Sequence, residues 1–187
     1  MIIIGITGTL GAGKGTVVNY LVKKKGFVHF SVRKYLVKLI RKENREPTRD
    51  AMVEMANRLR KKYGPSYLVE ELFKEAQKTG KNCIIESIRT EGEIAALRTK
   101  GKFTLIAVDA DRELRYKRAI ERDSETDDIS FEKFVEDEEL EMTSADPAKQ
   151  NLNRCMELAD YTIQNNSTIG VLNEKVSKIL HEIKKAK

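Results

Sequence analysis

The amino-acid sequence predicts an α/β fold in which a five-stranded parallel sheet is flanked by helices. Short apolar runs alternate with longer segments of helical periodicity along the chain of 187 residues. Parallel strands need crossover connections, and right-handed crossovers bring helices over both faces of a sheet. A glycine-rich segment also joins the first apolar run to the first helical segment. No repeat or Pro/Ser-rich linker divides the chain, so residues 1–187 are predicted to form a single domain.

The N-terminal part of the chain predicts three strands and four helices. Each predicted strand is an apolar run too short for a helix, and each predicted helix has apolar residues three or four positions apart. Gly64-Pro65 separates the third helix from the fourth. In chain order the predicted elements are strand Ile2–Thr7, helix Lys14–Lys24, strand Phe27–Phe30, helices Ser31–Arg41, Thr48–Lys62 and Ser66–Lys78, and strand Lys81–Glu86.

The C-terminal part predicts two strands and three helices. Phe103–Asp109 is the clearest strand after the first, because its apolar run is continuous. The polar segment Asp123–Ile129 interrupts the helical periodicity that precedes it. The predicted elements are strand Phe103–Asp109, helices Asp111–Arg122 and Phe131–Met142, strand Asp160–Gln164 and helix Val171–Ile183.

The composition is ordinary for a globular protein, with 40% hydrophobic and 34% charged residues. There is no run of eighteen or more apolar residues, so no membrane span is expected. The apolar N-terminus lacks a basic leader and runs straight into Gly8, so it is interpreted as a buried strand and not as a signal peptide. Cys83 and Cys155 are expected to be free thiols in a reducing cytoplasm.

The net charge of +6 is compatible with nucleic-acid binding or with a site that handles several phosphates. Lysines gather at Lys23–Lys25 and at the C-terminal end, where solvated helix termini explain them. Aromatic residues make up 6% of the chain and none is Trp, so no stacking platform for bases is evident. The distribution of charge therefore favours a small phosphate-bearing partner over a nucleic acid. The sequence does not predict the oligomeric state.

The segment Gly8–Thr16 predicts a phosphate-binding loop, because it follows a predicted strand and opens a predicted helix. Glycines let backbone N–H groups face a phosphate, and the helix adds the positive end of its dipole. Lys14 is expected to contact the β- and γ-phosphates of ATP, and Thr16 to hold a phosphate oxygen or Mg²⁺ through water. A glycine-rich turn with a stray lysine is the disfavoured alternative. The predicted nucleotide-binding residues are Gly8, Gly11, Ala12, Gly13, Lys14, Gly15 and Thr16.

The residue after the loop lysine narrows the class of kinase. Many phosphate-binding loops have Ser or Thr directly after the lysine, whereas here Gly15 takes that place and the hydroxyl follows at Thr16. This Lys-Gly-Thr sequence resembles the loop of adenylate kinases and related nucleoside monophosphate kinases. The resemblance implies a P-loop NTPase fold with a helical acceptor-binding flap, here about residues 31–80, and a short lid, about residues 123–130.

A strand that ends in an acid is the second sequence feature that indicates a phosphate-handling site. Ile84–Arg89 places Glu86 at the carboxyl end of a buried strand and Arg89 three residues later. Carboxyl ends of parallel strands line the ligand crevice, so Glu86 is expected to hold Mg²⁺ through water and Arg89 to bind the acceptor's phosphate. The segment resembles the Asp-Gly-Ile-Arg stretch of an archaeal group related to adenylate kinases, with Glu86 for Asp and Ser87 for Gly. An ordinary charged strand terminus is the alternative.

Arg115, Arg118 and Arg122 recur at helical spacing and share one face. They form either a salt-bridged helix or a set of guanidiniums that stabilise charge on the transferring phosphoryl group. The helix before the lid of nucleoside monophosphate kinases carries arginines in a similar pattern, which implies the second role for Arg118 and Arg122. The acids Asp137, Glu138 and Glu141 follow, and for most of them a solvated acidic face is expected over pairing with these arginines.

The parts of the predicted site that would bind the acceptor and the adenine base are marked by weaker sequence patterns. Adenylate kinases have an acid after their second strand, whereas this chain has Arg33-Lys34 near that place, which suggests a more anionic or repositioned acceptor. Arg33 and Arg60 are the predicted acceptor-binding residues of the flap. Asp160–Ser167 resembles a stretch of dephospho-coenzyme A kinases and of the archaeal group. The resemblance implies that Asn165 lies at the adenine edge, and a simple turn residue is the equal alternative.

Taken in chain order, these motifs predict an ATP- and Mg²⁺-dependent phosphotransferase, with a nucleoside or deoxynucleoside monophosphate as the favoured acceptor. Lys14, Glu86, Arg118 and Arg122 are the predicted catalytic residues. No general base is needed, since a phosphate acceptor is already anionic near neutral pH. The alternatives are a dephospho-coenzyme A kinase-like enzyme, whose base would be Glu86 or an acid among 109–111, and a nucleotide-binding regulatory module with low turnover.

Overall fold

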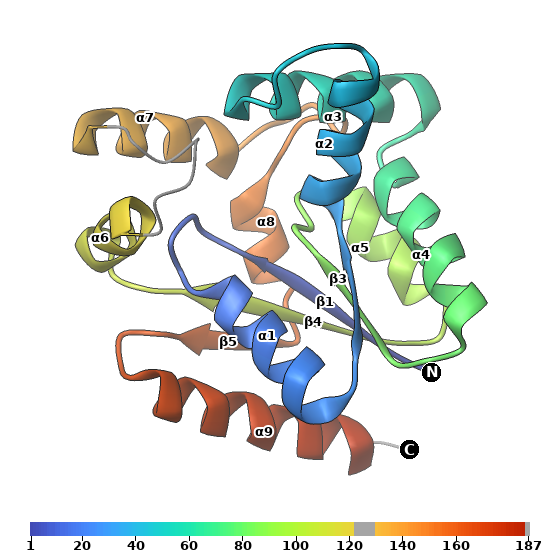
Figure 1. The fold of residues 1–187 in the computed structure, drawn as a ribbon, viewed down its shortest axis with the longest axis vertical. Coiled ribbons are helices and arrows are strands. Elements are labelled where there is room, and N and C mark those ends of the chain that lie inside the picture. Colours follow the sequence, from blue (N-terminus) through green and yellow to red (C-terminus); the bar gives the residue numbers. More distant parts are fainter. Residues whose placement is uncertain (122–129, 186–187) are drawn as a thin grey trace.

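The computed structural model describes residues 1–121 and 130–185, which form a sheet covered by helices (Figure 1). All four strand pairings are parallel, and the strand order is β2-β3-β1-β4-β5. The predicted fold class, a five-stranded parallel sheet flanked by helices, is therefore confirmed. The strands are β1 (Ile2–Gly8), β2 (Val28–Ser31), β3 (Cys83–Glu86), β4 (Lys102–Asp109) and β5 (Tyr161–Gln164).

Seven helices lie where the sequence periodicity predicts them, with ends within two residues of the predicted ones. They are α1 (Lys14–Lys25), α2 (Val32–Lys42), α3 (Arg49–Tyr63), α4 (Tyr67–Thr79), α6 (Arg112–Glu121), α7 (Phe131–Met142) and α9 (Ile169–Lys185). Two further helices, α5 (Glu91–Arg98) and α8 (Leu152–Glu157), were not predicted. Both are too short for a clear hydrophobic period, although Thr90 and Glu93 form a capping box at the start of α5.

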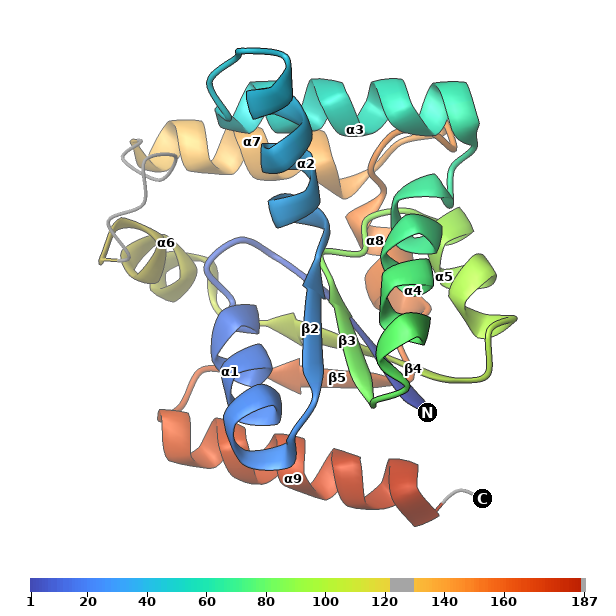
Figure 2. The same ribbon diagram turned by 45° about the vertical axis from the view of Figure 1, so that its right-hand side comes forward.

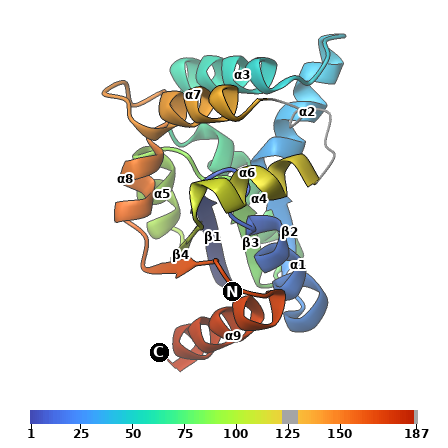
Figure 3. The same ribbon diagram turned by 90° about the vertical axis from the view of Figure 1, so that its left-hand side faces the viewer.

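Residues of the central strand alternate between two cores. Ile3 packs into the cluster beneath α2–α5 and α8, whereas Ile4 and Ile6 pack into the cluster with α1 and α9. This alternation follows from the two-residue period of a strand. Figure 3 shows α1 and α9 in the lower part of the view and α5 and α8 to the left of the strands. The continuous apolar runs of the sequence are explained by burial on both faces.

In Figure 2 the carboxyl end of β2 points up toward α2, whereas β4 and β5 run toward the left, where α6 lies. Gly8, Glu86 and Asp109 are the last residues of β1, β3 and β4, and pairing places them at one edge of the sheet. Ligands of open parallel sheets bind in the crevice at this edge. Among the described helices, none is long and apolar enough to cross a membrane.

A buried ion pair joins α3 to α5. Arg60 is 2% exposed and Glu93 is fully buried, and both Nε and Nη2 of Arg60 donate to Oε1 of Glu93, at 3.1 and 2.8 Å. The other oxygen of Glu93 accepts from the backbone N–H groups of Arg89 and Thr90. Glu93 therefore holds the segment after β3 as well as α3, and so places Arg89 relative to α3.

Glu93→Ala is expected to lower the free energy of unfolding by about 3–5 kcal/mol, because it leaves the Arg60 guanidinium buried without its counter-charge. Chemical denaturation with urea measures this change. The double variant Arg60→Met/Glu93→Leu serves as the control, since it removes both charges and is expected to lose less than Glu93→Ala alone. A single variant as stable as the wild type would contradict the structural role of the pair.

Candidate active site

The loop Gly8–Lys14 joins β1 to α1 and presents the start of that helix to solvent. Gly13 is the N-cap of α1 with φ of 97°, and it provides no side-chain cap. Helices α2, α3, α5, α7 and α8 begin instead with a side chain that accepts a backbone N–H. The carbonyl of Gly13 accepts from the N–H of Thr16 at 3.0 Å, but no N-cap side chain occupies the start of α1. The N–H groups of this first turn and the helix dipole together form an anion-binding site.

Three glycines of this loop are approached closely by other groups, and Gly8 is the first, since a Cβ there would lie 1.9 Å from the carbonyl oxygen of Val108. A Cβ on Gly11, whose φ is +76°, would lie 2.1 Å from the carbonyl oxygen of Arg115. A Cβ on Gly13 would lie 2.3 Å from Nδ2 of Asn165. Gly15 differs, since a Cβ there has no described heavy atom within 4 Å. Packing therefore explains these three glycines, whereas the described part of the fold places no such demand on Gly15.

Most of the predicted nucleotide-binding residues line one pocket over the loop, which we call the nucleotide pocket. Its lining includes Leu10, Gly11, Gly13, Lys14, Gly15, Thr16, Asn19, Glu86, Arg118, Asn165 and Ser167. Nζ of Lys14 donates to the carbonyl oxygens of Gly8 and Thr9, at 2.9 and 2.6 Å. Gly8 and Ala12 are not part of the lining, and the carbonyl of Ala12 accepts from the Asn165 side chain. The structure thus brings together residues from the N-terminal loop, the middle of the chain and the turn after the last strand.

Glu86 lies in this pocket at the end of β3. One of its oxygens is 2.9 Å from Nε2 of His29, which lies on the neighbouring strand β2. Burial opposes ionisation of Glu86, but the His29 hydrogen bond and the charges of Lys14 and Arg89 hold its pKa below the usual value. Glu86 is therefore a carboxylate at neutral pH, close enough to the loop lysine and to Arg89 to be stabilised by both charges.

The same pocket contains donors suited to a magnesium ion bound to phosphates. Carboxylate and hydroxyl oxygens are preferred by Mg²⁺, and Glu86 and Thr16 both line the pocket. The described residues contain no group of three or more His, Cys, Asp or Glu side chains that could hold a metal ion. This arrangement fits Mg²⁺, which is usually held by one or two protein ligands together with substrate phosphates.

The other acids at this edge of the sheet are engaged with protein groups. Oδ1 of Asp109 accepts from the hydroxyl of Thr9 at 2.5 Å and lies 3.5 Å from Nε of Arg115. Asp111 accepts from the side chain of Asn166. Neither acid lines the nucleotide pocket, whereas Glu86 does. If a hydroxyl acceptor required a base, Glu86 is thus better placed than the acids among 109–111.

The arginines of α6 have different environments. Arg115 is buried and pairs with Glu138 and Asp109, and its guanidinium also donates to the carbonyls of Ala110 and Leu10. Arg118 lines the nucleotide pocket and donates to the carbonyl of Asn165 at 2.8 Å. The salt-bridged alternative therefore describes Arg115, and the catalytic role stays a prediction for Arg118. Arg122 and residues 123–129 of the predicted lid lie outside the described residues.

Asn165 is buried and connects the final strand to the loop. Its Nδ2 donates to the carbonyl of Ala12 at 2.8 Å. Its backbone N–H donates to the carbonyl of Asp109 at 2.7 Å, which ties the residue after β5 to the end of β4. Asn165 therefore holds the loop and the sheet edge in register, and it also lines the nucleotide pocket. A contact with the adenine edge stays a prediction.

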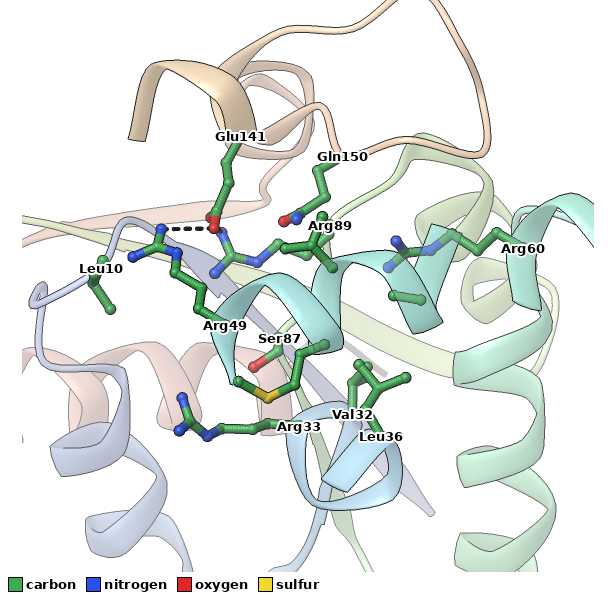
Figure 4. A pocket seen from close by; sticks show the side chains of 13 residues that line it. Leu10, Val32, Arg33, Leu36, Arg49, Arg60, Ser87, Arg89, Glu141 and Gln150 are labelled. Carbon is green, nitrogen blue, oxygen red and sulfur yellow. Dashed lines mark hydrogen bonds and ion pairs between the residues drawn. The ribbon is translucent and has the colours of Figure 1, made fainter. Parts of the chain in front are cut away.

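A second pocket lies beside the first, between α2, α3 and the end of β3 (Figure 4). Leu10 lines both pockets, and the adjacent residues Glu86 and Ser87 each line one. The second pocket combines an apolar wall with four arginines and one acid. Its lining residues are Leu10, Val32, Arg33, Leu36, Arg49, Met52, Val53, Ala56, Arg60, Ser87, Arg89, Glu141 and Gln150.

The three arginines predicted to bind the acceptor, Arg33, Arg60 and Arg89, all line this second pocket. Arg33 is exposed at the start of α2. Arg60 is held by Glu93, so its charge is balanced inside the protein. Arg89 is partly buried at the centre of the pocket in Figure 4. The structure thus brings these residues together, and their binding roles stay predictions.

Ser87 has φ of 72°, which is unusual for a residue other than glycine. Its backbone N–H, and that of Ile88, both donate to the carbonyl of Ile6 in β1. These bonds impose the left-handed turn that directs the chain from Glu86 to Arg89. A glycine would adopt this left-handed backbone more readily than a serine does. Ser87 lines the second pocket, where strained backbone is often functional.

The expectation of a solvated acidic face on α7 is wrong for three of its acids. Glu138 is 5% exposed and pairs with Arg112 and Arg115. Asp137 pairs with Lys133 and Arg49, and Glu141 pairs with Arg49 and Arg89. Sequence periodicity could not show this, because most of the partners come from other helices and from the segment after β3.

Arg49 and Gln150 are pocket residues that the sequence patterns did not predict. Arg49 is the first residue of α3, after the N-cap Thr48. A cation in the first turn of a helix is unfavourable for the helix dipole, and this was the available signal that Arg49 serves another purpose. No signal marked Gln150, which lies in the irregular segment before α8.

The fold and the loop define the class of this protein. The sheet is parallel, a phosphate-binding loop follows its first strand, and a second pocket rich in arginine lies beside the loop. This is a P-loop kinase-like architecture that binds nucleotides. The family model described as "AAA domain" matches residues 4–144.

The chain belongs to the UPF0200 family. A UPF0200 protein of Sulfurisphaera tokodaii is 31% identical over 185 residues, which cover 97% of both chains. Among solved structures, shikimate kinase from Aquifex aeolicus has a TM-score of 0.55, 14% identity and full coverage of both chains. Dephospho-CoA kinase from Campylobacter jejuni has a TM-score of 0.51 and 16% identity, covering 97% of this chain and 96% of that one. At these identities the two kinases show the shared fold.

Proposed function

We propose that this chain transfers a phosphoryl group from ATP to a small acceptor that itself carries a phosphate, with a nucleoside or deoxynucleoside monophosphate as the leading candidate. The single observation behind the proposal is the adjacency of the two pockets. The phosphate-binding loop lines one and four arginines line the other, and they meet at Leu10 and at Glu86-Ser87. A donor and an acceptor bound in these pockets would have their reacting phosphates next to each other.

The residues at this junction suit phosphoryl transfer. Lys14 and the start of α1 would bind the phosphates of ATP, and Arg118 would stabilise charge on the transferring group. Glu86 and Thr16 would hold Mg²⁺, which supplies charge neutralisation between the phosphates when it is bound. Arg33, Arg49 and Arg89 would bind the acceptor's phosphate, and the apolar wall with Met52 and Ala56 would contact the rest of the acceptor.

The arginines favour an anionic acceptor over a neutral one. A guanidinium that lines a pocket is costly to desolvate unless an anion binds there. A hydroxyl acceptor, as in a dephospho-coenzyme A kinase-like enzyme, would in addition require a base, for which Glu86 is the acid in the nucleotide pocket. A phosphate acceptor needs no base, so it makes fewer demands on the same residues.

Release of ADP tests the proposal. The purified chain is incubated with ATP and Mg²⁺ alone and with each member of a panel of ribo- and deoxynucleoside monophosphates and dephospho-coenzyme A. We expect at least one monophosphate to raise the rate of ADP release about tenfold or more above the rate without acceptor. Stimulation by dephospho-coenzyme A alone would support the hydroxyl-acceptor alternative. ATP binding with no stimulation by any member would support a regulatory module and overturn the proposal.

A further inference from the structure

The carboxylate of Glu141 lies inside the arginine-lined pocket and joins two of its arginines. Oε1 of Glu141 accepts from Nη2 of Arg49 at 2.7 Å, and Oε2 lies 3.2 Å from Nη1 of Arg89. Figure 4 shows Glu141 reaching down from α7 to the place between these two guanidiniums. Glu141 is the one acid among the described residues that line this pocket. Each of its oxygens thus contacts a different arginine, as two oxygens of a phosphate group could.

The pair with Arg89 is incomplete. Nη1 of Arg89 is buried and makes no hydrogen bond with any described residue, although it lies within ion-pair distance of Glu141. A buried guanidinium nitrogen without a hydrogen bond is costly, and a phosphate offers more acceptor oxygens in more directions than a carboxylate. A phosphate in this place can therefore satisfy Arg89 better than Glu141 does.

The position of Glu141 in its helix also favours its release. Glu141 lies in the last turn of α7, which contains no basic residue, so its charge is close to the negative end of the helix dipole. The rest of α7 has other attachments. Glu138 pairs with Arg115, and Asp137 pairs with Lys133 and, at 3.6 Å, with Arg49. The carboxylate of Glu141 can therefore leave the pocket by a movement of the final turn of α7, while the rest of the helix stays attached.

We infer that Glu141 holds the place of the acceptor's anionic group, and that acceptor binding exchanges the Glu141 carboxylate for a phosphate on Arg49 and Arg89. The inference rests on the proposed function, because it concerns regulation of the same acceptor pocket. An acceptor without an anionic group cannot replace the lost ion pairs, so Glu141 selects against neutral acceptors. The exchange also lowers the apparent affinity for the correct acceptor, since part of its binding free energy opposes Glu141.

Binding of inorganic phosphate tests the exchange without any need for turnover. The dissociation constant is measured by calorimetry in the presence of saturating ADP and Mg²⁺, so that the nucleotide occupies the loop. We expect Glu141→Gln to bind phosphate about tenfold more tightly than the wild type. Glu141→Asp keeps the charge but shortens the side chain, so it cannot reach both arginines, and we expect it to bind phosphate several-fold more tightly as well.

Asp137→Asn is the matched control. Asp137 lies on the same helix and pairs with the same Arg49, but it does not line the pocket. We expect its phosphate affinity to stay within about threefold of the wild type. Equal effects of Asp137→Asn and Glu141→Gln, or an unchanged affinity in Glu141→Asp, would show that general charge alone is at work and would overturn the inference. So would a failure of Glu141→Gln to bind phosphate more tightly than the wild type.

The outcome separates this inference from the proposed function. If an acceptor stimulates ADP release but Glu141→Gln changes neither the phosphate affinity nor the KM for that acceptor, the exchange is wrong and the kinase proposal stands. If the Glu141 variants bind phosphate more tightly but no member of the acceptor panel stimulates ADP release, Glu141 competes with an anion for Arg49 and Arg89, but the kinase proposal fails. Thermal unfolding of each variant confirms that the comparison is made between folded proteins.

Discussion

Lys14→Ala is expected to lower the acceptor-stimulated rate of ADP release at least about a hundredfold. Nζ of Lys14 is held at the loop by the carbonyls of Gly8 and Thr9, beside the start of α1. A charge in that place stabilises the negative charge that develops as the phosphoryl group leaves ADP. The rate at saturating ATP and acceptor measures the loss, and the dissociation constant for ATP measured separately shows how much of it is ground-state binding.

Lys23→Ala is the matched control for this variant. Lys23 lies in the last turn of the same helix, where it is exposed and outside both pockets. Its removal takes one positive charge from α1 without touching the loop, so we expect a rate within about twofold of the wild type. A Lys14→Ala protein that retains its acceptor-stimulated rate would show that transfer does not take place at the loop.

Glu86→Gln is expected to lower the same rate about a hundredfold at low Mg²⁺ and to lose less at high Mg²⁺. The substitution keeps the size of the side chain but removes the charge that would hold the ion. The low pKa of Glu86, which the contact with His29 and the charges of Lys14 and Arg89 produce against the effect of burial, keeps this carboxylate ionised at neutral pH. Measuring the rate over a range of Mg²⁺ concentrations therefore tests whether Glu86 holds the ion.

Asp109→Asn serves as the control for the metal role, because Asp109 also ends a central strand but accepts from Thr9 and pairs with Arg115. We expect it to change stability and rate without changing the Mg²⁺ concentration that gives half of the maximal rate. If Glu86→Gln leaves this concentration unchanged while Asp109→Asn raises it, the metal is held at β4 and the assignment to Glu86 is wrong.

The elements of the fold were predictable where periodicity and loop chemistry are local. The central strands β1, β3 and β4 are largely apolar runs because they are buried on both faces, whereas the edge strands β2 and β5 are only partly buried. Helix α5 escaped prediction because its eight residues are too few to show a period, although the Thr90–Glu93 capping box was present in the sequence. Helix α8 is shorter still, with six residues.

Part of the candidate site was also predictable, because some of its residues are marked by their close neighbours in the chain. The loop and the residue Glu86 at the end of β3 are marked by their place next to buried strands, and both line the nucleotide pocket. The pairing of side chains was not predictable. Arg60 lies in a buried pair with Glu93, and Glu138 lies against Arg115, because helices distant in the chain pack together. Such partners follow from packing that no sequence period encodes.

The sequence by itself determined the class of this protein, because a phosphate-binding loop needs its glycines, its lysine and its flanking strand and helix within a single short segment. Only the tertiary structure decided what the charged residues do. It places Arg49, Arg89 and Glu141 in one pocket, although they come from α3, the segment after β3 and α7. The physical reason is the separation along the chain over which each feature is defined. The phosphate-binding loop is formed by residues that are neighbours in the chain, whereas ion pairs form between any charges that the fold brings within a few ångströms.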